Sequence, residues 1–195
     1  RPAPARPTAR GGKWARGPQF EMAPTGATRE ISGTGVEPVY ARAILCGLIF
    51  HPEVIQPYAE AIAGLPIADK DLAALRNIVL NAAYEHRTLD SQALITICED
   101  QGSGALAARL IDANGLAFSF TRRQSEAELA RRDLGMAIEV LSARPELDAA
   151  LEAATARLAE HWDDTRFAEQ MRLQQARREA DAKLASLAER AGDGD

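Results

Sequence analysis

The sequence is short of the residue types that build metal centres and disulfide frameworks. Its 195 residues include two cysteines and three histidines. Cys46 and Cys98 form no CxxC or Cys–His pattern and fall on apolar helix faces, so we expect two buried thiols rather than a disulfide or a zinc site. His51, His86 and His161 share no spacing with acids or cysteines that is typical of metal ligands.

Catalytic patterns are also lacking. The glycines near 102–104 are not followed by the Lys and Ser/Thr of a phosphate-binding loop, and no serine sits in a nucleophile elbow. The acid pairs Glu99-Asp100 and Asp163-Asp164 lie at expected helix ends, where capping accounts for them. We therefore predict no catalytic residue, no metal and no cofactor for this chain.

No apolar run is long enough to cross a bilayer and no signal peptide is present, so we expect a cytoplasmic protein without membrane contact.

The run Ala41 to Ile49 has Arg42 as its only charge, and a helix that is apolar all round belongs inside a bundle. Pro52 pushes His51 out of the helical region, so the helix must end there. A His51 cation would suit the dipole at that end.

Abundant Ala and Leu among Glu and Arg predict an all-α fold, since aromatic residues make up only 5% of the chain. Residues 1–37 carry six basic and three acidic groups, which leaves −8 on the remainder of a chain whose net charge is −5. An acidic folded part argues against direct, sequence-specific nucleic-acid binding.

Residues 1–37 are rich in Pro and Gly, show no periodicity and hold five basic groups in their first twenty residues. This composition predicts a disordered basic linker, and the alternative is a basic arm that touches nucleic acid. Because the chain begins with Arg rather than Met, we expect it to be a piece of a longer polypeptide.

The sequence of residues 38–118 predicts a compact bundle of about five short helices. Asp69 is expected to cap a helix whose apolar residues recur at helical spacing, and Asp90 or Thr88 to cap the next. Gly102 should end that helix, and Ser103 should open a fifth.

Residues 119–144 predict a long connecting helix, opened by a capping box at Ser125 and Glu128 and interrupted by Pro145. Residues 145–191 then predict a helical hairpin. Its first helix has a narrow apolar seam, and its second helix follows the Asp163-Asp164 pair. The seam residues are Leu147, Leu151, Ala154 and Leu158. Two helices bury little surface, so the hairpin should be mobile and ready to pack against a partner. The Arg-rich part of the last helix, balanced by acids, is typical of a solvated face.

Taken in order, these segments resemble one known family. Arg42 with AILCGLIFHPEV, then LPIADKDLAALRNIVL, LDSQALITICEDQG, and the long helix from Ser125 resemble the C-terminal helicase-binding domain of bacterial DNA primase, in its alphaproteobacterial form. The resemblance covers about 38–190, and residues 1–37 fit the linker to the catalytic core. The zinc-binding module and the acidic metal site of that core are absent, so zinc and magnesium would belong to parts outside this chain.

The resemblance implies that this chain is not itself an enzyme. Its parent would be a DNA primase, a DNA-directed RNA polymerase that makes primers. In that family the terminal hairpin docks on the N-terminal domains of the hexameric replicative helicase, in the cytoplasmic, nucleoid-associated replisome. Basic residues of the bundle receive the acidic tail of single-stranded-DNA-binding protein, and the positions that correspond here are Arg42, Arg76 and Arg109.

Large apolar side chains commonly carry most of an interface's binding energy, which points to particular hairpin residues. We expect Trp162, Met171, Leu184 and Leu187 to contact the helicase, with Arg178 on the charged side of the last helix. Phe167 and Leu173 are expected to pack within the hairpin.

Two other functions remain open. The first is a coiled-coil adaptor or regulator that self-associates through its hairpin, although a seam of two heptads per helix is short for stable association. The second is a helical enzyme or RNA-processing fragment that uses the basic arm, although no set of acids, histidines and nucleophiles converges.

Overall fold

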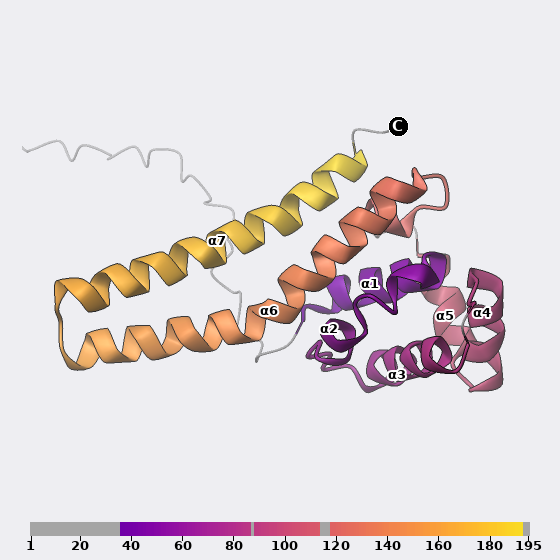
Figure 1. Ribbon diagram of the computed structural model, residues 1–195, viewed down its shortest axis with the longest axis horizontal. Coiled ribbons are helices and arrows are strands. Elements are labelled where there is room, and N and C mark those ends of the chain that lie inside the picture. The colour runs from indigo at the N-terminus through magenta and orange to yellow at the C-terminus, as the bar shows by residue number, and fades with distance from the viewer. Residues whose placement is uncertain (1–35, 87, 114–117, 193–195) are drawn as a thin grey trace, which may run out of the picture. The chain divides into compact units, whose positions relative to one another are not determined.

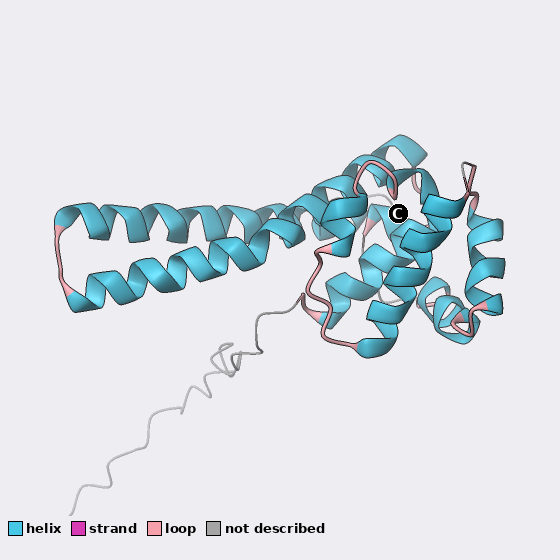
Figure 2. Cartoon of the chain, turned by 60° about the horizontal axis from the view of Figure 1, so that its bottom comes forward, coloured by secondary structure: helices cyan, strands magenta, loops and turns pink. Residues whose placement is uncertain are grey.

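The computed structural model describes residues 36–86, 88–113 and 118–192. This part of the chain contains seven α-helices, two short 3₁₀ helices and no strand, which confirms the predicted all-α fold (Figures 1 and 2). The helices are α1 (Pro38–Phe50), α2 (Ala59–Ala63), α3 (Lys70–Glu85), α4 (Ser91–Asp100), α5 (Gly104–Ile111), α6 (Ala127–Glu160) and α7 (Asp164–Gly192), and the 3₁₀ helices are η1 (Pro52–Val54) and η2 (Ser119–Thr121).

The predicted linker of residues 1–37 lies outside the described residues except for its last two. Val36 is buried in the core, and its N–H donates to the carbonyl of Pro66 at 2.9 Å. Glu37 is the N-cap residue of α1. The folded unit therefore begins earlier than predicted, because residue 36 gains both an apolar contact and a backbone hydrogen bond.

Helix α1 is the centre of the bundle, as its sequence predicted. Every residue from Ala41 to Ile49 except Arg42 is buried. Helix α1 contacts α3, α4, α5, α6 and η2. Gly47 permits η2 and α6 to approach α1 closely, since a Cβ there would lie 2.7 Å from Cδ2 of Phe120 and 3.0 Å from Cδ1 of Leu134. Such crowding would force a neighbour to move.

The helix ends follow local rules, most of them as predicted. The Asp69 carboxylate accepts hydrogen bonds from the N–H groups of Asp71 and Leu72, and Asp90 caps α4 in the same way. Gly102 has φ of 77°, and its N–H and that of the next residue bond back to the last turn of α4, which is a Schellman motif.

The predicted capping box at Ser125 is wrong. The Ser125 N–H donates to the carbonyl of Arg122 in a turn that follows η2. Helix α6 therefore starts later, with Glu126 as an N-cap residue that makes no side-chain cap hydrogen bond.

The predicted interruption at Pro145 is also wrong, because α6 is one helix of 34 residues that contains this proline. Pro145 has no N–H to donate to the carbonyl of Leu141, and its ring crowds that carbonyl. Helix α7 packs along α6 (Figure 1), and this tertiary packing offsets the lost hydrogen bond. The helix bends instead of ending, and Figure 1 shows the axis of α6 changing direction in its middle part.

The C-terminal end of α7 packs back on the bundle. Leu184 and Leu187 are 1% and 0% exposed and belong to the same hydrophobic core as α1, and α7 also contacts η2. The sequence predicted a hairpin held only by its own two helices. The structure shows that its second helix is anchored at the far end.

His51 ends α1, where its N–H donates to the carbonyl of Gly47 at 2.8 Å. Its side chain is 13% exposed, with Nδ1 3.8 Å from Oε1 of Glu53, and its buried Nε2 has no hydrogen-bond partner among the described residues. Burial lowers the pKa of His51, and the Glu53 carboxylate opposes this only in part. The folded protein thus favours the neutral imidazole over the cation expected from the helix dipole.

We predict that stability decreases in mild acid through His51. A histidine whose folded pKa lies below its unfolded value of 6.5 takes up a proton more readily when unfolded, so the free energy of unfolding should fall as pH drops through that value. Urea unfolding at about pH 7.5 and about pH 5.5 measures the effect on either side of the histidine range. His51→Gln should reduce the difference, whereas the same change at the exposed His86 should not. Equal pH dependence in all three proteins would contradict the assignment.

A candidate protein-interaction surface at the hairpin tip

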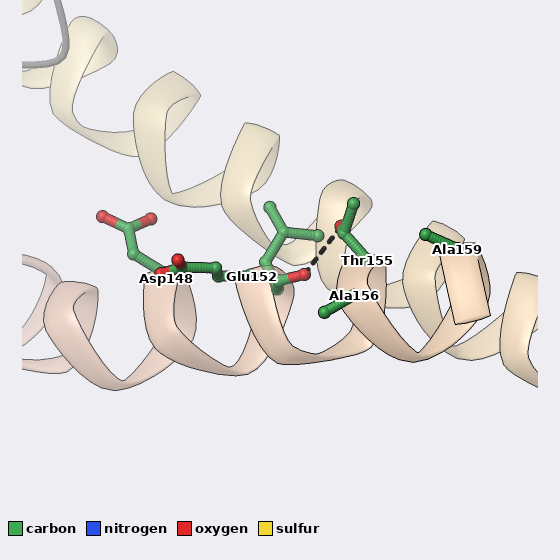
Figure 3. Close-up of a pocket in the computed structure, with 6 residues that line it drawn as sticks. Asp148, Glu152, Thr155, Ala156 and Ala159 are labelled. Atoms are coloured by element: carbon green, nitrogen blue, oxygen red, sulfur yellow. Dashed lines mark hydrogen bonds between the residues drawn. The ribbon is translucent and has the colours of Figure 1, made fainter.

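The outer half of α6 carries a shallow hollow of about 470 Å³ (Figure 3). Its lining residues recur every three or four positions and so form one face of the helix. Thr155 lies in the middle of this face, and its hydroxyl donates to the carbonyl of Leu151 at 2.8 Å. Ala156 and Ala159 each contribute only a methyl group to this face. The lining residues are Asp148, Leu151, Glu152, Thr155, Ala156 and Ala159.

Helix α7 continues this face. Gln170 Nε2 donates to the Thr155 hydroxyl at 3.4 Å, which places that side of α7 beside the hollow. Phe167 and Met171, three residues before and one after Gln170, are 45% and 42% exposed. Trp162, in the connection between the helices, is 67% exposed. We call Trp162, Phe167 and Met171 the tip surface.

The tip surface agrees only in part with the packing predicted for the hairpin. Trp162 and Met171 are exposed, as a partner contact requires, and Leu173 is 8% exposed, which confirms that it packs internally. Phe167 was predicted to pack internally and does not, because it lies on the side of α7 that turns away from the seam. Arg178 is exposed, two turns beyond Met171 on the same side.

Leu184 and Leu187 were predicted to contact the partner, and the structure corrects this. Both are buried in the core, so neither can reach a partner in this conformation. Their spacing gave no sign of this, since an apolar pair near a helix end looks the same whether its cover comes from the same chain or from another.

A ring of four charges joins the two hairpin helices beside Pro145. Arg144 lies 3.0 Å from Asp181 and 3.9 Å from Asp148, and Arg177 pairs with both aspartates. Burial lowers the pKa of Arg177, but the two carboxylates outweigh this and raise it above its ordinary value. The sequence predicted only a solvated face for the Arg-rich part of the last helix. The signal that could have revealed the ring is a pair of Arg–Asp steps at i, i+4, one on each helix.

The three arginines predicted to receive an acidic tail lie on three helices, α1, α3 and α5. Arg42 and Arg109 are exposed. Arg76 donates to the carbonyl of Leu65 at 2.8 Å and to the amide oxygen of Asn77. The first of these hydrogen bonds holds the segment between α2 and α3 against α3. Binding of an acidic tail by these residues stays a prediction.

Both cysteines are buried. Burial raises the pKa of Cys46 to about 12 and also raises that of Cys98, so both thiols are protonated at neutral pH. No group of three or more His, Cys, Asp or Glu side chains among the described residues is placed to hold a metal ion. No helix within residues 36–86, 88–113 or 118–192 is both long and apolar enough to span a membrane.

The described residues therefore form an all-α fold with an exposed apolar surface at the tip of a helical hairpin. Comparison with protein-family models, with curated proteins and with solved structures gave no match.

Proposed function

We propose that this chain is a protein-interaction domain of a DNA primase, which docks on the replicative helicase and brings primer synthesis to the replication fork. The observation that carries the proposal is the tip surface, with three large apolar side chains exposed within ten residues of each other. Exposed aromatic and methionine side chains are typical anchors of protein interfaces. The ordered resemblance of residues 38–190 to the helicase-binding domain supplies the identity of the partner.

The distribution of apolar side chains favours the hairpin over the bundle as the docking element. Among the described residues of the bundle, most large apolar side chains are buried, and the exposed ones, Val39 and Tyr84, lie on different helices. At the tip, Phe167 and Met171 share one side of α7, and Trp162 lies just before that helix. A small apolar surface suits a contact that must form and break between primers, because transient interfaces are commonly small.

Self-association through the hairpin is the second candidate. Its seam is already occupied within one molecule, since Ala154 and Leu173 are buried and Arg157 of α6 lies 3.0 Å from Glu169 of α7. A dimer would therefore have to use the tip surface instead. Sedimentation of the chain at rising concentration separates this candidate from docking.

The proposal is tested by titrating the full chain into the replicative helicase of the same organism and measuring the heat of binding. Trp162→Ala and Met171→Ala should each weaken binding by about 30-fold, the loss that corresponds to about 2 kcal/mol at a central interface residue. Their melting temperatures should stay near that of the wild type, because both side chains are exposed.

Tyr84→Ala is the matched control, since it removes an aromatic side chain that is 77% exposed on the bundle. It should bind as the wild type does. Undiminished binding by Trp162→Ala, Phe167→Ala and Met171→Ala would show that the docking surface lies elsewhere. Absence of any binding by the wild type would overturn the proposed partner.

A further inference from the structure

Helix α6 has a weak point in its middle. Pro145 removes one backbone hydrogen bond from the helix, and the carbonyl of Leu141 loses its partner four residues on. The two sides of this point differ in how they are held. Before it, Leu134, Ile138 and Leu141 are each 0% exposed in the core. After it, Ala154 is the one residue of α6 that is buried.

The ring of charges spans this weak point. Arg144 and Asp148 flank Pro145 on α6, and they pair with Asp181 and Arg177 on α7. The two arginine side chains are only 14% and 22% exposed, so solvent screens these pairs less than it screens fully exposed ones. The ring therefore fixes α7 against α6 at the place where α6 is least able to resist bending.

Helix α7 reaches past the weak point to the bundle. Leu184, one turn beyond Asp181, and Leu187, a further turn on, pack in the core that α1 organises. One stretch of α7, residues 177–187, thus contacts the hairpin side of Pro145 through Arg177 and the bundle side through the two leucines. We call this stretch the strap.

We propose that the strap holds α6 stiff across Pro145, and that releasing it lets the hairpin tip swing relative to the bundle. Without the strap, the tip is connected to the bundle by a proline-weakened helix. With the strap in place, α7 packs against α6 on both sides of Pro145, and this packing resists bending of α6. The direction in which the tip surface is presented is therefore set by charges and leucines that lie away from that surface. The inference does not depend on which partner the tip binds.

The test exchanges charges between positions without changing composition or net charge. In the first variant, Arg144→Asp is combined with Asp148→Arg, so that like charges face each other across the two helices. In the second, Arg177→Asp is combined with Asp181→Arg, with the same effect. Combining all four substitutions restores every acid–base pair, with the acid and the base exchanged between the two positions. This fourfold variant is the matched control.

Movement is measured as the distribution of distances between spin labels on Glu160→Cys at the tip and Tyr84→Cys on the bundle. Cys46 and Cys98 are buried, and singly substituted proteins show whether either takes up label. The distribution should be narrow in the parent protein and in the fourfold variant, and broad in each twofold variant. A narrow distribution in all four proteins would overturn the proposal.

A further variant locates the hinge. Adding Pro145→Ala to the first twofold variant should narrow its distribution again, because the restored hydrogen bond stiffens α6. A distribution that stays broad would place the hinge elsewhere and overturn the proposal.

Discussion

Phe120→Ala should lower the free energy of unfolding by about 3–5 kcal/mol, the range found for large aromatic side chains removed from a core. Phe120 is 1% exposed, stacks on Phe118 with ring centroids 5.1 Å apart, and lies against Gly47 of the central helix. Little can move in to fill the space, because η2 is fixed between α1 and α6. Urea unfolding followed by circular dichroism measures the loss.

Phe167→Ala is the control for Phe120→Ala, since it removes the same side chain from a position that is 45% exposed. Its effect on stability should stay within about 1 kcal/mol, as for most surface substitutions. Comparable losses from the two variants would mean that Phe167 packs more tightly than its exposure indicates.

Asp133→Ala should lower the free energy of unfolding by about 2–4 kcal/mol, because it removes a buried hydrogen bond and leaves a buried polar group without that partner. Asp133 is 0% exposed on α6, and its Oδ2 accepts a hydrogen bond from the Ser119 hydroxyl of η2 at 2.7 Å. The substitution leaves that buried hydroxyl without this acceptor. Thermal and urea unfolding at neutral pH measure the change.

Two variants separate the buried hydrogen bond from loss of an acidic residue in general. Asp133→Asn keeps an acceptor of the same shape and should be less destabilising than Asp133→Ala. Glu128→Ala removes an acid that is 84% exposed and paired with Arg131, and it should change stability by less than about 1 kcal/mol. If Glu128→Ala and Asp133→Ala are equally destabilising, the buried bond has no special importance.

Several parts of the fold could be predicted because they depend on residues close together in the chain. The burial of α1 follows from its apolar run, the start of α3 follows from Asp69, and the two ends of α4 follow from Asp90 and Gly102. Each of these signals acts within one or two helical turns. The fold class was accessible for the same reason, since helical spacing and capping are local.

The candidate site was less predictable, because exposure depends on which side of a helix meets a distant segment. Trp162 and Met171 were named as partner contacts, and the structure leaves both exposed. Two residues were predicted wrongly. Phe167 was expected to pack internally and is exposed, whereas Leu187 was expected at an interface and lies in the core. Nothing within a turn of either residue distinguishes the two outcomes.

The sequence by itself therefore determined that this protein is helical, where α1 ends, where α3 starts, where α4 starts and ends, and that α1 lies at the centre. Only the tertiary structure decided that α6 continues through Pro145, that Arg144 and Arg177 join a ring with two aspartates, and that α7 returns to the core. The physical reason is the range of the interactions. Caps and helical periodicity act over a few residues, whereas the packing that outweighs a proline comes from a helix some 30 residues further along the chain.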